Sequence, residues 1–140
     1  MNQKSIIFAT VLTIVVALVA AVAVGYAALP QVPGKIELSA TEFDYGTIPN
    51  TGPVSQVFQV RNAGDGPLEI GGVSTSCGCT TAEVGSQQLA AGESTDLTVT
   101  YDPLAHDGAT GEFMRLVYIR SDDPENPEAN LTVRVTVVQP

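Results

Sequence analysis

The segment Leu131-Thr132-Val133-Arg134-Val135-Thr136-Val137 places an apolar side chain at every second position. This alternation is typical of a β-strand that is covered on one face only. Residues 57–61 and 96–101 show the same period of two. Because helical spacing is hard to find after residue 36, the C-terminal part of the chain is predicted to be all-β.

Turn-forming residues separate the alternating segments. Residues 62–67, 90–93 and 121–124 are rich in Gly, Pro, Asn and Asp, which favour turns through positive φ, fixed φ or local side-chain hydrogen bonds. Between the turns lie apolar runs near residues 36–41, 54–62, 67–74, 79–84, 95–101, 112–120 and 129–138. This count and spacing predict an immunoglobulin-like antiparallel β-sandwich of about seven strands over residues 36–140. Its predicted core consists of Phe58, Val60, Leu68, Ile70, Leu97, Val99, Val117, Ile119, Val133 and Val135.

An uncharged and mostly apolar stretch from Ile6 to Leu29 precedes the predicted domain. About 20 such residues cross a bilayer as a helix. We therefore expect one N-terminal transmembrane helix within residues 1–29, followed by a linker over residues 30–35. The alternative is a cleaved secretory signal, since Lys4 supplies a basic start, although the apolar core of a signal usually has only about 7 to 15 residues.

The charges of the chain predict that the domain lies outside the cytoplasm. Lys4 precedes the apolar stretch, whereas all 15 Asp and Glu residues follow it. Basic flanks are retained in the cytoplasm, so residues 30–140 are expected on the outer side as part of a single-pass membrane protein, or as a secreted or periplasmic protein if the signal is cleaved. The formal net charge of −9 argues against a nucleic-acid partner. The expected partners are the membrane, through residues 6–29, and a protein of the cell envelope.

Five short motifs resemble a known bacterial family, the domain of unknown function family 1573. They are Phe43-Asp44-Tyr45-Gly46-Thr47-Ile48, Val57-Phe58-Gln59-Val60-Arg61-Asn62-Ala63-Gly64, Pro67-Leu68-Glu69-Ile70, Ser76-Cys77-Gly78-Cys79-Thr80 and Ala91-Gly92-Glu93. The resemblance covers roughly residues 36–138, and the block with two cysteines is its most specific part. Ala91 stands where the family usually has proline. The family is similar in fold to the Hydin-type ASH domains, so the resemblance implies an immunoglobulin-like fold and an envelope setting.

The triplet Cys77-Gly78-Cys79 concentrates the reactive side chains of the chain and admits three interpretations. In an oxidising compartment the two thiols can form a disulfide. Residues two apart in an extended strand have Cα atoms near the upper limit of about 6.8 Å for such a bond, so a bend at Gly78 would be required. A ring this small stabilises a fold little and is easily reduced, which suits a redox role.

The second interpretation is a metal site and the third is simple packing. Cys77 and Cys79 as thiolates would suit Cu(I), whereas zinc normally takes four ligands and the chain offers only His106 in addition. As a packing residue, a buried cysteine behaves as a small hydrophobe. Burial against Val73 or Val84 would favour packing, and exposure of both sulfurs would favour chemistry.

No motif predicts an enzyme. The chain has no Gly-rich phosphate loop and no nucleophile elbow, and a single histidine makes general acid and base catalysis improbable. We therefore expect a membrane-anchored binding or scaffolding module without a cofactor. The alternative is a thiol protein that binds copper or exchanges disulfides through Cys77 and Cys79.

Overall fold

The computed structural model of the chain describes residue 3 and residues 11–18, 32–105 and 107–140. It divides into two compact units, Met1–Gln31 and Val32–Pro140. In the first unit, residues 11–18 form a helix. The predicted transmembrane segment over residues 6–29 lies mostly outside the described residues. None of the helices that the structure describes has both the length and the apolar character that a bilayer crossing requires.

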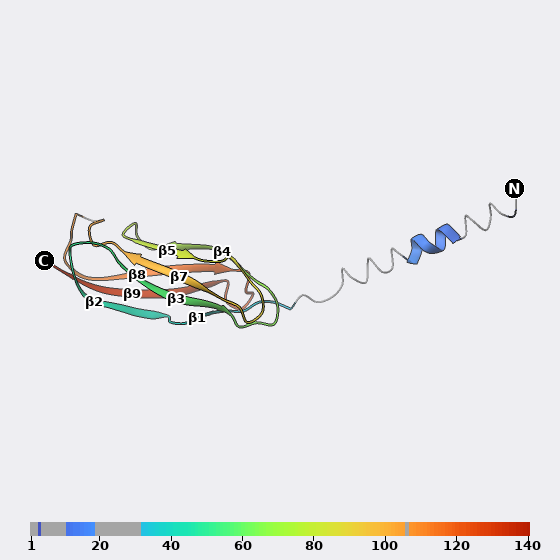
Figure 1. Ribbon diagram of the computed structural model, residues 1–140, viewed down its shortest axis with the longest axis horizontal. Helices are drawn as coiled ribbons and strands as arrows, with labels where there is room; N and C mark the ends of the chain where they lie inside the picture. The colour runs from blue at the N-terminus through green and yellow to red at the C-terminus, as the bar shows by residue number, and fades with distance from the viewer. Residues whose placement is uncertain (1–2, 4–10, 19–31, 106) are drawn as a thin grey trace. The chain divides into compact units, whose positions relative to one another are not determined.

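The second unit is a sandwich of two β-sheets (Figure 1). One sheet has four strands in the order β1-β3-β7-β5, and the other has five in the order β2-β9-β8-β4-β6. The strands are β1 (Ile36–Leu38), β2 (Glu42–Pro49), β3 (Val54–Asn62), β4 (Leu68–Thr75), β5 (Thr80–Val84), β6 (Gln88–Leu89), β7 (Ser94–Tyr101), β8 (Gly111–Ser121) and β9 (Glu128–Val138).

The prediction of about seven antiparallel strands is wrong in two respects. The described part of the chain holds nine strands, because β2 and β6 were not predicted. β6 has only two residues, and β2 is interrupted by a register shift between Asp44 and Thr47, where Gly46 adopts a φ of 72°. In addition, β2 runs parallel to β9. Parallel partners need a long crossover connection, here the rest of the domain, so no local pattern reveals this pairing.

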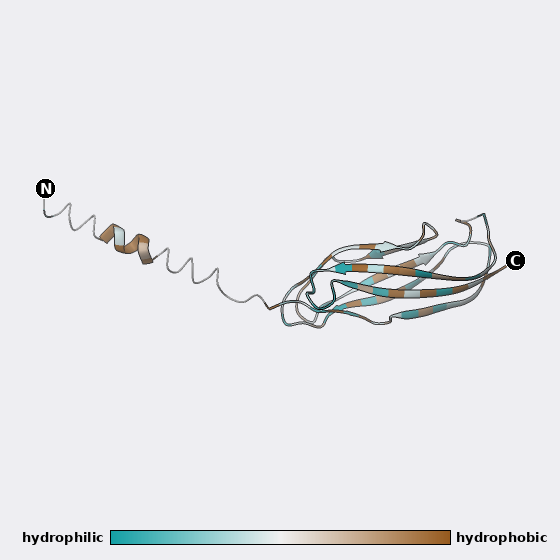
Figure 2. Cartoon of the chain, turned by 180° about the vertical axis from the view of Figure 1, so that it is seen from behind, coloured by the Kyte–Doolittle hydropathy of each residue, from teal (hydrophilic) through white to brown (hydrophobic). Residues whose placement is uncertain are grey.

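All ten predicted core residues are buried between the two sheets. The alternation that predicted them is visible along the strands in Figure 2. Thirteen buried residues, among them Phe58, Leu97 and Val133, form the main cluster. A second cluster is made of Ile48, Cys79, Tyr101, Val135 and Val137. The alternating pattern therefore predicts which face of each long strand is buried.

The chain enters the domain over a tight contact at residues 32–35, the last part of the predicted linker. A Cβ atom added to Gly66 would lie 1.7 Å from the carbonyl oxygen of Val32, and one added to Gly64 would lie 2.6 Å from the backbone nitrogen of Lys35. Only glycine permits this close approach of two backbones. Residues 32–35 therefore belong to the compact unit.

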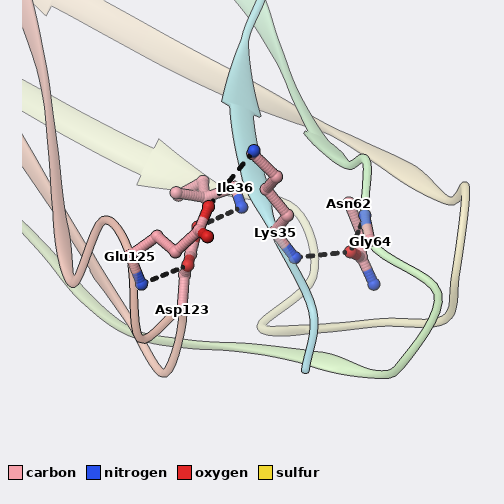
Figure 3. A network of polar contacts seen from close by, with 6 residues as sticks. All are labelled: Lys35, Ile36, Asn62, Gly64, Asp123 and Glu125. Carbon is pink, nitrogen blue, oxygen red and sulfur yellow. Dashed lines mark hydrogen bonds and ion pairs between the residues drawn. The ribbon is translucent and has the colours of Figure 1, made fainter. Parts of the chain in front are cut away.

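Asn62, which is fully buried, joins this entry segment to the rest of the domain (Figure 3). Its Oδ1 accepts hydrogen bonds of 3.0 Å from the backbone nitrogens of Lys35 and Gly64. Its Nδ2 donates to the carbonyl oxygens of Gly66, of Leu89 at the end of β6 and of Ala90, at 2.8 to 3.1 Å. One side chain thus satisfies five backbone groups that would otherwise be left without partners in the interior.

Asp123 holds the start of β1 from the other side (Figure 3). Its carboxylate is 2 % exposed and accepts hydrogen bonds from the backbone nitrogens of Ile36 at 2.9 Å and Glu125 at 2.8 Å. Burial by itself would raise the pKa of this carboxyl, but the backbone donors and the charge of Lys35 outweigh burial and lower it. Lys35 also forms an exposed ion pair with Glu125 at 3.3 Å.

Acid should therefore weaken the domain through Asp123. Because its pKa in the folded state lies below the unfolded value of about 3.9, the stability that it provides is present above about pH 4 and is lost as the pH falls through the folded pKa. Replacing Asp123 by Asn should lower the free energy of unfolding by about 2 kcal/mol at neutral pH, since hydrogen bonds to a charged group are lost. This difference should shrink in strong acid. Urea unfolding of residues 32–140 at neutral pH and in strong acid measures this difference in unfolding free energy between the parent and the variant. The exposed Asp65→Asn is the control. A difference that is the same at both pH values would contradict the prediction.

Candidate functional site

Both cysteines lie in the turn between β4 and β5. We call residues 75–80 the disulfide turn. Cys77 and Cys79 are joined by a disulfide, with their Cα atoms 5.3 Å apart. The backbone bends at Gly78, where the nitrogen of Thr80 donates to the carbonyl oxygen of Cys77 at 3.3 Å. The bend that the sequence required for a disulfide is thus present, and the bond closes a ring of three residues.

Hydrogen bonds hold the disulfide turn independently of the sulfur bond. The hydroxyl of Thr75 lies 3.0 Å from the carbonyl oxygen of Cys77 and 2.7 Å from that of Thr80, so it links the first residue of the turn to the middle and to the last residue. Ser76 and Leu116 of β8 are linked twice: the nitrogen of Ser76 donates to the carbonyl oxygen of Leu116 at 2.9 Å, and the nitrogen of Leu116 donates to the hydroxyl of Ser76 at 3.0 Å. The turn is therefore attached to the neighbouring strand by groups other than sulfur.

The two cysteines differ in their exposure to solvent. Cys79 is 2 % exposed and belongs to the second core cluster, together with Tyr101 and Val137. Cys77 is half-buried and packs against the same cluster. The cluster does not include Val73 or Val84, the neighbours expected for a packing role. One sulfur is thus part of the core, while the other belongs to a residue that solvent reaches.

A cation contacts the buried cysteine. Nε of Arg115 donates to Sγ of Cys79 at 3.1 Å, and the guanidinium lies over the ring of Phe113, 5.1 Å from its centroid. The hydroxyl of Thr80 is 3.7 Å from each sulfur. The sequence analysis did not single out Arg115. A signal was available, because the alternation of β8 puts residue 115 on the same inward face as Val117 and Ile119, and a charged residue at an inward position needs a partner.

The same cation influences Tyr101, which lies on β7 beside the disulfide turn. Burial raises the pKa of the Tyr101 hydroxyl, and the positive charge of Arg115 partly offsets this effect. The nitrogen of Asp102, the next residue, donates to the carbonyl oxygen of Cys79 at 2.8 Å. Cys79 thus contacts the guanidinium of Arg115 through its sulfur and the backbone nitrogen of Asp102 through its carbonyl oxygen.

Metal binding by Cys77 and Cys79 would require the reduced state of this turn, whereas the structure shows the disulfide. Each sulfur is bonded to the other, and a disulfide sulfur is not the thiolate that copper or zinc requires. Copper binding therefore needs reduction of the bond first, and it stays a prediction. His106, the other candidate ligand, lies outside the described residues. Within the part of the chain that the structure describes, no three His, Cys, Asp or Glu side chains gather as a metal-binding group.

Solved structures with a similar fold include three informative ones. A protein of unknown function from Porphyromonas gingivalis W83 is 27% identical with a TM-score of 0.68, over 79% of this chain and 50% of that one. The ASH/PapD-like domain 7 of human CEP192 has a TM-score of 0.59 at 10% identity, over 76% and 87% of the two chains. The chaperone YadV has a TM-score of 0.56 at 15% identity, over 73% and 51%.

The fold of this chain is thus similar to the β-sandwich of the ASH/PapD-like domain of CEP192. The chain spans about half the length of the P. gingivalis protein. No curated protein matches it. The model of the family described as "Protein of unknown function (DUF1573)" matches residues 36–137, which confirms the resemblance seen in the sequence. With nearly three quarters of its length matched by that model, the chain belongs to the DUF1573 family.

Proposed function

We propose that the β-sandwich is a protein-binding module, and that its binding face is the outer surface of the five-stranded sheet around Met114, Leu116, Tyr118 and Arg134. The observation that carries the proposal is the row of large side chains along β8. Met114 is 53 % exposed, and Leu116 and Tyr118 are half-buried on the same face. Arg134 of β9 is the register partner of Met114.

The composition of this row supports binding. Met, Tyr and Arg are enriched at protein interfaces relative to the rest of protein surfaces. The outer face of the four-stranded sheet is different, since the outward positions of β3 and β7 carry mostly small or polar side chains, with Val57 as an exposed apolar one: Ser55, Val57, Gln59, Arg61, Asp96, Thr98 and Thr100. The two outer faces are thus chemically distinct, and the outer face of the five-stranded sheet has the composition that is more typical of a protein interface.

A surface depression beside Met114 adds selectivity. It has a volume of about 510 Å³ and is lined, among others, by Asp44 of β2, Glu112 of β8 and Arg134 of β9. Two carboxylates and one guanidinium around a flexible thioether suit a partner segment that carries an apolar side chain next to a basic one. YadV is described as a chaperone, and a chaperone acts on other proteins; the shared fold is consistent with a binding role.

The N-terminal sequence supports a proposal about the place of action. We propose that residues 6–29 tie the domain to a membrane, or serve as a secretory signal, and that residues 36–140 act outside the cytoplasm by binding rather than by catalysis. The length of the apolar stretch and the single Lys4 before it support this orientation.

One labelling experiment tests the face and the location together. Met114→Cys and Val57→Cys introduce thiols at positions of nearly equal exposure, 53 % and 49 %, on opposite outer faces of the sandwich. A membrane-impermeant maleimide is applied to intact cells and to the purified chain. We expect both variants to react when purified. On intact cells the thiol at position 57 should react, while a bound partner protects position 114 at least about threefold, because an occupied interface excludes reagent as it excludes water.

Two outcomes would contradict the proposal in different ways. Equal labelling of both positions on intact cells would show that the outer face of β8 is free. Labelling of both positions only after the membrane is permeabilised would place the domain in the cytoplasm.

A further inference from the structure

We propose that the disulfide turn is a thiol–disulfide exchange site for a dithiol substrate. Cys77 is the sulfur that the substrate attacks, Cys79 is the leaving sulfur, and Arg115 stabilises the thiolate that forms. This activity goes beyond the proposed binding function, and its site, the disulfide turn, is joined by hydrogen bonds to Leu116 of the proposed binding face.

The difference in exposure assigns the roles of the two sulfurs. Exchange requires direct access of a thiolate to the sulfur that it attacks. Cys79 is 2 % exposed and surrounded by the second core cluster, so an external thiolate has no approach to it in the folded domain. Cys77 is half-buried, which leaves it as the accessible member of the pair. Attack at Cys77 makes Cys79 the leaving group.

Arg115 is placed to stabilise that leaving group. Its Nε lies 3.1 Å from Sγ of Cys79. A disulfide sulfur is a weak acceptor, whereas a thiolate next to a guanidinium receives a charge-assisted hydrogen bond. Arg115 takes part in none of the three ion pairs formed by the described residues, so no carboxylate there competes for its charge. The hydroxyl of Thr80, 3.7 Å from the sulfur, is a second donor in reach.

The fold tolerates opening of the ring. The chain-entropy contribution of a disulfide falls as the closed loop becomes shorter, and here the two cysteines are only two positions apart. The hydrogen bonds of Thr75 and Ser76 hold the turn without the sulfur bond. Reduction therefore leaves both thiols close together in a folded domain, ready for the reverse reaction.

The exchange balances without another reactant. The first substrate thiolate attacks Sγ of Cys77; the Cys77–Cys79 bond breaks, a mixed disulfide forms on Cys77, and Cys79 leaves as a thiolate. The second thiolate of the substrate attacks the substrate sulfur of the mixed disulfide, which forms the substrate disulfide and releases Cys77. Two electrons pass from the dithiol to the cysteine pair, and the two protons of the substrate thiols end on Cys77 and Cys79.

The rate of reduction by dithiothreitol tests the role of Arg115. The full chain in mild detergent is mixed with reduced dithiothreitol, quenched with an alkylating reagent and weighed by mass spectrometry, while circular dichroism monitors the fold. We expect reduction of the folded domain, and Arg115→Gln to slow it about tenfold because a charge-assisted hydrogen bond to the leaving sulfur is lost. Arg115→Lys should recover part of the rate. The matched control is Arg120→Gln on the same strand, whose side chain pairs with Glu128 at 3.2 Å, and it should react like the parent.

Single-cysteine variants test the roles of the sulfurs independently of Arg115. With glutathione disulfide as the probe, Cys79→Ser should form a mixed disulfide at Cys77 at least about tenfold faster than Cys77→Ser forms one at Cys79, because only the first thiol is accessible. Equal rates would overturn the assignment of roles. A parent disulfide that is reduced only after the domain unfolds, or an Arg115→Gln variant that is folded and reacts at the parental rate, would overturn the exchange site.

Discussion

Replacing Asn62 by Asp should lower the free energy of unfolding by at least about 3 kcal/mol at neutral pH, although the two side chains have nearly the same shape. The side-chain oxygen that receives hydrogen bonds from Lys35 and Gly64 is retained. The amide that donates to Gly66, Leu89 and Ala90 becomes a carboxylate oxygen facing three carbonyl oxygens. Urea unfolding of residues 32–140 measures the loss.

The matched control for this change is Asn130→Asp. Asn130 lies exposed on β9, so the same chemical change should alter the unfolding free energy by less than about 0.5 kcal/mol. If both variants were equally stable, the hydrogen bonds of Asn62 would contribute nothing specific, and another contact would have to hold residues 33–36 to the domain.

Asn62 also shows why the sequence predicted some parts of this fold and not others. Within residues 62–67 it reads as an ordinary turn residue, whereas in the structure it is the last residue of β3 and the turn begins after it. Its full burial depends on partners near residues 35 and 90, which are distant in sequence. Local patterns report periodicity and turn chemistry, whereas they contain no information about which distant loops meet.

At the candidate site, too, the sequence predicted the local features and missed the contacts between distant segments. The sequence located the Cys77-Gly78-Cys79 triplet and the bend that a disulfide would need at Gly78, because both depend on neighbouring residues. It left three states of the sulfurs open, because the residues that bury Cys79 come from β2, β7 and β9 and the charge beside it comes from β8. Arg115 is 36 positions away from the sulfur that it contacts, so its contribution appears only when the strands are assembled.

Strand β2, which the sequence analysis missed, joins the two sheets. Tyr45 donates from its hydroxyl to the carbonyl oxygen of Val99 in the opposite sheet at 2.8 Å, and burial raises its pKa to about 12. Phe43 meets Phe58 of the opposite sheet edge to face, with ring centroids 5.3 Å apart. In β2 these aromatic side chains alternate with Glu42, Asp44 and Gly46, and acidic residues and glycine are uncommon in strands, so the segment did not stand out as one.

Phe58→Ala should lower the free energy of unfolding by about 3 to 5 kcal/mol, as large-to-small changes in packed cores do. Phe58 is 5 % exposed and lies in the main core cluster, so its removal leaves a cavity and takes away the aromatic contact with Phe43. The control is Val57→Ala on the same strand; Val57 is 49 % exposed on the opposite face, and its truncation should cost less than about 0.5 kcal/mol. Urea unfolding of residues 32–140 compares the two variants. A loss below about 1 kcal/mol for Phe58→Ala would mean that the inward face of β3 is wrongly assigned, because no packed aromatic side chain is removed at so small a cost.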